Sequence, residues 1–160
     1  MVAFDNNLFF VLHDVARLLR TRFDQRASAY GMTRAQWVIL VRLQRQPGLC
    51  QSDMASLCEV EPITVARLVD RLEASGLVER RADPTDRRVH RLHLLPAAEP
   101  VLAEIARYRD QVCEELSEGL TPEAWATVLD LLLNVKEKLT TDNKEKATAE
   151  SAKARAGAGD

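Results

Sequence analysis

The sequence predicts a mostly α-helical protein that carries one small β-hairpin. Apolar residues recur at intervals of three and four over most of the chain up to about residue 140, which is the spacing of amphipathic helices. Helix start and stop signals punctuate these segments, among them Thr33, Gly76 and Pro122. Residues 77–95 differ, because two short runs rich in apolar and β-branched residues flank a turn that contains Pro84.

Length and composition favour one domain or two closely packed subdomains. The chain has 160 residues, of which 46% are hydrophobic, enough to build a core. It contains no apolar run of about eighteen residues, so we expect no membrane-spanning helix. No basic leader is present at the N-terminus, which argues against a secretory signal, and we expect a cytoplasmic location.

Charge is distributed unevenly along the chain. The net charge is −2, but residues 80–91 hold five arginines against two aspartates, a local balance of +3. Residues 99–123 hold seven acidic residues against two arginines, a balance of −5. Only the first of these segments is therefore suited to face phosphate groups.

Apolar spacing and end signals predict the first two helices. The first helix should end before Tyr30-Gly31, where glycine suits a helix stop. Thr33 is expected to cap a second helix that continues to Pro47-Gly48. The apolar face of the first helix is formed by Leu8, Val11, Leu12, Val15, Leu19 and Phe23.

Two shorter helices should follow, the first capped by Ser52 and the second running from Pro62 to about Ala74. Helical spacing gives the second of them a buried stripe, which consists of Val65, Leu68, Val69 and Leu72. A polar stripe lies about 120° further round and consists of Thr64, Arg67 and Arg71. The pair forms a helix-turn-helix, although a helix hairpin with solvated arginines fits these two helices equally well.

The strand pair decides between these interpretations. The segment that links residues 77–81 to residues 89–95 is longer than a tight hairpin, so it should protrude. Arg87 and Arg88 stand at its tip. A helix-turn-helix followed by such an arm is a winged helix, which offers a helix to the major groove of DNA and an arm to the minor groove.

Two long helices complete the predicted fold. One begins after Pro96 and Pro100, and the other begins at Thr121-Pro122. Together with the first helix they hold more apolar surface than one small winged helix needs, so we expect a two-fold dimer. The alternative is a monomer whose long helices cover one another.

The expected organisation therefore has three parts. Residues 1–32 and 96–140 form a helical dimerisation region, and residues 33–95 form the winged helix-turn-helix. Residues 141–160 lack large apolar side chains and are expected to form a disordered tail.

Chemistry at cysteine, histidine or a cofactor is not predicted. Cys50, Cys58 and Cys113 are odd in number and unpaired in sequence, which disfavours a disulfide framework. His90 and His93 should point to opposite faces of a strand, so no metal site is expected. Glycine-rich phosphate loops and nucleophile motifs are missing, and we expect neither a cofactor nor an enzyme.

With these motifs, residues 8–140 resemble the MarR family of bacterial regulators, and within it the SlyA-like branch. The resemblance rests on three strings, residues 30–37, 69–80 and 83–88, of which the last two at this separation are specific. It implies a homodimeric winged helix-turn-helix protein that binds a pseudo-palindromic operator. Such proteins usually repress transcription, although SlyA-like members can also relieve silencing.

The resemblance also implies roles for single residues. Thr64 and Arg67 match reading-helix positions that contact DNA in the family. Arg87 and Arg88 match the wing arginines, one of which typically enters the minor groove, and Asp86 matches the acid that holds that arginine.

General chemistry extends this set. Arg67 can donate two hydrogen bonds to a guanine edge. Ser52, at the start of its helix, is a candidate for a phosphate contact through its hydroxyl group and the helix amides. Arg71 contacts either phosphate or an acid on the protein surface.

Similar family members release DNA when a small molecule enters between the dimer helices and the winged part. In this chain the matching positions are His13, Arg17, Arg20 and Trp37. An arginine pair beside an indole can hold an aromatic carboxylate, or its thioester, while the ring stacks. The alternative is a solvated arginine pair and a core tryptophan.

One rival class remains open, a winged-helix module that contacts proteins and does not read DNA. It would keep the buried stripe but would not need Thr64, Arg67 and Arg87 together.

Overall fold

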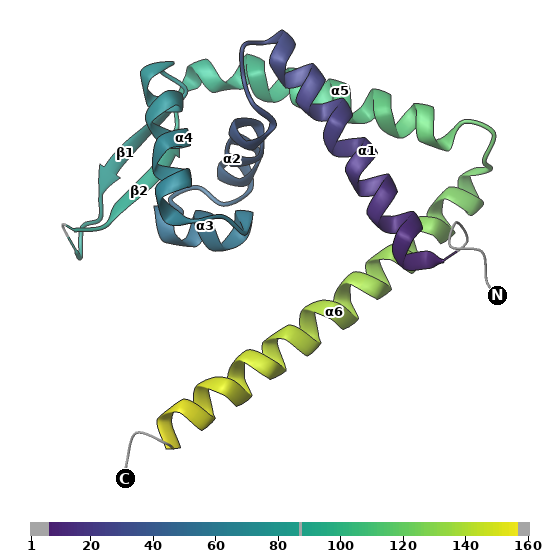
Figure 1. Ribbon diagram of the computed structural model, residues 1–160. Helices are drawn as coiled ribbons and strands as arrows, with labels where there is room; N and C mark the ends of the chain where they lie inside the picture. Colours follow the sequence, from purple (N-terminus) through teal and green to yellow (C-terminus); the bar gives the residue numbers. More distant parts are fainter. Residues whose placement is uncertain (1–6, 87, 157–160) are drawn as a thin grey trace. The chain divides into compact units, whose positions relative to one another are not determined.

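The computed structural model describes the backbone of residues 7–86 and 88–156, and the side chains of these residues as far as residue 141. Within these residues, five helices and a two-stranded antiparallel sheet precede one long helix (Figure 1). In chain order the elements are α1 (Leu8–Ala29), α2 (Arg34–Arg45), α3 (Gln51–Cys58), α4 (Pro62–Ala74), β1 (Val78–Ala82), β2 (His90–Leu94), the 3-10 turn η2 (Pro96–Ala98), α5 (Glu99–Ser117) and α6 (Pro122–Ala156). The predicted fold class, mostly helical with one hairpin, is confirmed.

The chain divides into two compact units, and the boundary falls between Arg109 and Asp110, inside α5. The first unit contains α1 to α4, the sheet and the first half of α5. Its division into a winged part and a dimerisation part, at residues 33 and 96, stays a prediction.

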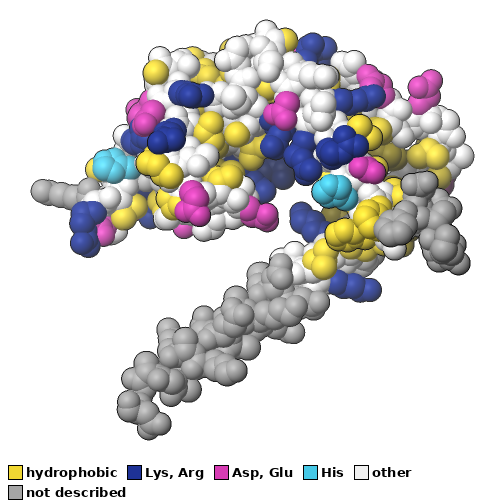
Figure 2. All heavy atoms as spheres, in the orientation of Figure 1, with side chains coloured by type: hydrophobic (Ala, Val, Ile, Leu, Met, Phe, Trp, Pro, Cys, Tyr) yellow, Lys and Arg dark blue, Asp and Glu magenta, His cyan; other side chains and the backbone are white. Residues whose placement is uncertain are grey.

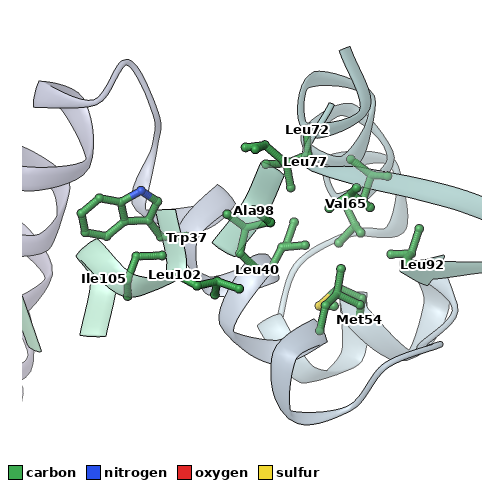
Figure 3. Packing of buried hydrophobic residues seen from close by; sticks show 14 of the residues in the cluster. Trp37, Leu40, Met54, Val65, Leu72, Leu77, Leu92, Ala98, Leu102 and Ile105 are labelled. Atoms are coloured by element: carbon green, nitrogen blue, oxygen red, sulfur yellow. The ribbon is translucent and has the colours of Figure 1, made fainter. Parts of the chain in front are cut away.

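The core of the first unit is built around α2, which contacts α1, α3, α4 and β2. Side chains from every helix of this unit and from both strands enter it. Figure 3 shows how members from α2, α3, α4, β2 and α5 pack together. The predicted stripe of α4 is buried at Val65, Val69 and Leu72, while Leu68 is half-buried. Fully buried members include Trp37, Ile39, Leu40, Leu43, Met54 and Leu92.

Several predicted end signals are present. Thr33 and Gln36 form a reciprocal capping box at the start of α2, and Pro62 occupies the first turn of α4. Gly31 and Gly76 follow α1 and α4 with φ angles of 67° and 68°, a conformation that side chains disfavour.

The predicted cap of α3 is wrong. Cys50, not Ser52, is the N-cap, and its Sγ accepts from the backbone N–H of Asp53 at 3.5 Å. The reason is a long-range contact: Leu92 N–H donates to the carbonyl of Leu49 at 2.9 Å, and Cys50 bridges to Arg91. This isolated β-bridge keeps the chain extended up to Cys50, so the helix begins at Gln51.

The second unit consists of the end of α5, a turn at Gly119 and helix α6. The predicted start of α6 is confirmed, because Thr121 Oγ1 accepts from the N–H of Ala124 at 3.2 Å and Pro122 follows it.

Where the sequence predicts a disordered tail from residue 141, the backbone of α6 is helical as far as Ala156. Alanine, lysine and glutamate dominate this stretch, and all three favour helix even without an apolar face. No helix in the described part of the chain is both long and apolar enough to cross a bilayer.

Candidate nucleic-acid interface

Helix α4 presents a continuous exposed face. Its buried stripe packs into the core, so Ile63, Thr64, Arg67 and Arg71 remain exposed. No described residue forms an ion pair or a hydrogen bond with the guanidinium group of Arg67 or Arg71. Ser75 Oγ donates to the backbone carbonyl of Arg71 at 2.9 Å and leaves its side chain untouched. These two guanidinium groups keep all their donors for an external partner.

The wing consists of β1, β2 and the segment that joins them. It is held at its base by Asp83, whose side chain is only 4% exposed. Its Oδ1 accepts hydrogen bonds from the backbone N–H of Thr85 at 2.7 Å, from Thr85 Oγ1 at 2.5 Å and from the N–H of Asp86 at 3.2 Å. Its Oδ2 accepts from Arg91 Nε at 2.5 Å. Hydrogen bonds from Thr85 and then from Arg91 hold the pKa of Asp83 well below its usual range, so the group stays charged.

The tip of the wing carries a second acid–arginine pair. Asp86 Oδ1 accepts from the backbone N–H of Arg88 at 3.0 Å and from its Nε at 3.2 Å, and Oδ2 accepts from its Nη2 at 3.3 Å. These hydrogen bonds from Arg88 lower the pKa of Asp86. The Arg88 side chain is nevertheless 91% exposed, so the carboxylate orients the guanidinium without covering it. Arg87 lies outside the described residues.

Arg80 has a role that the sequence pattern did not indicate. Its guanidinium lies inward, 19% exposed, and contacts Glu73, Asp70 at 2.7 Å and the Oε1 of Gln51 at 3.0 Å. Its Nη2 also donates to the carbonyl of Ala66 at 3.3 Å. Arg80 therefore ties α3, α4 and β1 together and is not available to phosphate.

The local charge of the wing is thus smaller than residues 80–91 imply. Arg81 pairs with Glu79, and Arg91 pairs with Asp83 while donating to the carbonyl of Gly48 at 3.0 Å. On the face seen in Figure 2, basic and acidic side chains are interspersed. The surface is suited to positioned contacts more than to a broad positive field.

Ser52 is exposed in the first turn of α3, with its Oγ 2.9 Å from the Sγ of Cys50. It borders a shallow, open hollow at the turn between α3 and α4, which is also lined by Ser56, Glu61 and Thr64. The structure thus brings Ser52 and Thr64 to one depression of the surface.

The four candidate effector residues differ in exposure to solvent. His13, Arg17 and Arg20 are exposed on α1, and Arg17 Nη2 donates to Asp14 Oδ1 at 3.1 Å. Trp37 is 2% exposed and belongs to the core. Its Nε1 is buried and has no hydrogen-bond partner among the described residues.

A further network within the first unit joins α1 to α5. Glu104 accepts from Arg26 Nε at 3.0 Å and from Arg107 Nη2 at 2.8 Å. The guanidinium of Arg26 also lies over the rings of Tyr30 and Tyr108, at 5.4 and 5.3 Å from their centroids. The hydrogen bond from Arg26, with that from Arg107, lowers the pKa of Glu104 to about 2.

Residues typical of other chemistries do not cluster in the part of the chain that the structure describes. There, no three His, Cys, Asp or Glu side chains lie close enough together to hold a metal ion. All three cysteines are free, and burial raises the pKa of the Cys58 thiol, which makes it less reactive.

Comparison with known proteins agrees with this geometry. Residues 32–90 match the MarR family model. The chain is 30% identical over 112 residues to the uncharacterized HTH-type transcriptional regulator YsmB of Bacillus subtilis (strain 168). The matched region covers 70% of this chain and 77% of YsmB.

Solved structures share the fold. The transcriptional regulator SlyA superposes with a TM-score of 0.74 at 24% identity, covering 86% of this chain and 96% of SlyA. A MarR-type regulator from Listeria monocytogenes, solved in complex with a 26mer DNA, gives a TM-score of 0.74 at 20% identity, covering 86% and 91% of the two chains. The family predicted from the sequence is confirmed: the chain belongs to the MarR family of transcriptional regulators.

Proposed function

We propose that this regulator binds a pseudo-palindromic DNA operator as a homodimer in the cytoplasm, most simply as a repressor, and that a small aromatic or lipophilic acid releases it. The observation that supports this proposal is that α4 and the wing, which both expose arginine side chains, belong to the same compact unit. Helix α4 exposes Arg67 and Arg71, whose guanidinium groups have no partner among the described residues, and the wing exposes Arg88 on an acid that fixes its direction.

Each of these two elements fits one groove of the DNA duplex. The N-terminal half of a reading helix contacts base edges in the major groove, where Arg67 can donate two hydrogen bonds to guanine. Arg88, with Arg87 beside it in the sequence, supplies positive charge for the more negative potential of a narrow minor groove. Ser52 and Arg71 supply contacts to phosphate. The Listeria relative in complex with DNA supports this assignment by analogy.

The proposed dimer accounts for apolar surface that the single chain leaves uncovered. In the first unit, α1 exposes Leu8, Phe9, Phe10, Val11, Val15 and Leu18. In the second unit, α6 exposes Val128, Leu129, Leu131, Leu132, Leu133 and Leu139. Monomeric proteins rarely expose apolar side chains in such numbers, and a second copy is the simplest cover.

The proposed effector site combines Arg17 and Arg20 on α1 with the indole N–H of Trp37, which no described residue accepts. A carboxylate could replace Asp14 as the partner of Arg17, and an acceptor atom of the ligand would satisfy Trp37 Nε1. Because Trp37 is buried, the ligand must open the packing around it, and that movement is what would couple binding to release of DNA.

The DNA proposal is tested by selecting binding sites from a random-sequence library and measuring affinity by fluorescence anisotropy at several salt concentrations. We expect a two-fold symmetric site, a complex containing two chains, and an affinity that falls steeply with salt. A protein that enriches no sequence and shows no salt-sensitive binding would contradict the proposal and favour the protein-contact module.

The effector proposal is tested by calorimetry with a panel of aromatic acids and their thioesters. We expect binding heat with the wild type and with Arg45→Ala, an exposed arginine on α2 that serves as the matched control. Arg17→Ala should abolish that heat. Equal heat from all three proteins would place the ligand elsewhere.

A further inference from the structure

The side chain that points most directly away from the core at the start of α4 is apolar. Ile63 is 61% exposed in the first turn of the helix. At 100° per residue it lies roughly 155° from the middle of the buried stripe formed by Val65, Val69 and Leu72, and Arg67 lies roughly 165° from it. Thr64 lies only about 105° away, at the side of the helix. Ile63 and Arg67 therefore form the outward centre of α4.

Exposure of one isoleucine needs no special explanation by itself, since scattered apolar residues are normal on protein surfaces. The position of Ile63 beside Arg67 is what suggests a role in contacting DNA. Ile63 precedes Arg67 by four residues, so the two side chains are neighbours on one face of the helix. That face starts at the N-terminal end of α4, the part of a reading helix that contacts base edges.

The chemistry of the major groove offers one apolar partner among its base edges, the C5-methyl group of thymine. Isoleucine is branched at Cβ and stiff about χ1, so it presents a fixed methyl surface at little further loss of side-chain freedom. We propose that Ile63 reads a thymine methyl group close to the base pair contacted by Arg67, and so determines part of the specificity of this regulator. This inference rests on the proposed function.

The test removes the methyl group from the DNA and its partner from the protein. Each thymine of a selected operator half-site is replaced in turn by deoxyuridine, which keeps every hydrogen bond and loses only the methyl group. Affinity is measured for the wild type, for Ile63→Ala and for Leu57→Ala. Leu57 is an exposed leucine on α3 that serves as the matched control. Alanine is favourable in a helix, so both variants should fold.

We expect a loss of about fourfold at one thymine of the half-site for the wild type and for Leu57→Ala, the size expected for one buried methyl group. The same replacement should leave the affinity of Ile63→Ala unchanged. A selected site without an invariant thymine, or a deoxyuridine penalty that persists in Ile63→Ala, would overturn the inference while leaving sequence-specific binding intact. Failure to select any site would overturn the proposed function itself, and the two failures are thus distinguishable.

Discussion

Asp83 and Arg91 form an ion pair across the base of the wing, with Arg91 Nε 2.5 Å from Asp83 Oδ2. The pair joins the first acid after β1 to the second residue of β2, and the same carboxylate accepts the hydrogen bonds of Thr85. The wing is therefore built around a charged group that is nearly buried, and its shape depends on that group remaining ionised.

Removing this carboxylate should weaken DNA binding without unfolding the core. In Asp83→Ala the N–H groups of Thr85 and Asp86 lose their acceptor, so the arm that carries Arg88 loses its fixed direction. We expect operator affinity to fall about tenfold, as for the loss of one or two hydrogen bonds that position the contact. Arg91→Met should have a similar effect, and the double variant should be little worse than either single one. Fully additive losses would show that the two residues act separately.

At the tip of the wing, Asp86 should act on DNA binding only through Arg88. Arg88→Ala should weaken binding to all sequences alike and reduce the slope of log K against log salt by about 1. Asp86→Asn in the wild type should lower affinity, because Arg88 loses its charged partner. The same change in an Arg88→Ala background should not, and an equal effect in both backgrounds would contradict this role.

Arg80 should matter for stability and Arg81 should not. Arg80→Ala leaves Glu73 and Asp70 without their counter-charge and removes a link between α3, α4 and β1, so we expect a loss of about 2–3 kcal/mol in the free energy of unfolding. Arg81→Ala, on the same strand, removes only an exposed pair with Glu79 and should change stability little. Urea titration at neutral pH measures both, and equal losses would contradict the inward role of Arg80.

Acid should weaken the link between α1 and α5. The pKa of Glu104 is lowered from its ordinary value of 4.5 to about 2 in the folded chain, first of all by the hydrogen bond from Arg26. A lowered pKa means that this group stabilises the fold above about pH 4.5 and that the contribution disappears as pH falls from 4.5 to about 2. The stability difference between wild type and Glu104→Gln should therefore be largest near neutral pH and shrink over that interval.

The control for this pH dependence is Glu118→Gln, which removes an exposed carboxylate outside the network of Arg26. Urea unfolding at a series of pH values should show the converging curves only for Glu104→Gln. A stability difference that stays constant from neutral pH to pH 2 would contradict the ionic role of Glu104.

Local signals were enough to predict most elements. Apolar spacing and caps such as Thr33 and Pro62 depend on residues three or four positions apart, and the structure places α2 and α4 where these signals stand. The start of α3 could not be found in this way, because Cys50 becomes the cap only when the neighbouring residue pairs with β2, more than forty residues later. The end of α6 was missed because helix propensity alone, without an apolar face, continues it to Ala156.

The candidate interface was predictable in composition but not in charge balance. Thr64, Arg67 and Arg71 are exposed on α4, as the helical spacing of the sequence requires. A count of arginines could not show that Arg80 lies inward and that Arg91 pairs with Asp83, because both depend on which acids the fold brings near. Nor could composition show that Trp37 is buried and that its Nε1 has no hydrogen-bond partner in the part of the chain that the structure describes.

Helix α4 is proposed to read DNA sequence through Arg67, and the binding sites selected by the wild type and by Arg67→Ala test this role most directly. We expect both proteins to select half-sites with the same spacing. Arg67→Ala should lose the preference at one base pair of each half-site and bind the wild-type operator about 1–3 kcal/mol more weakly. Identical base preferences and equal affinity for the two proteins would contradict the claim.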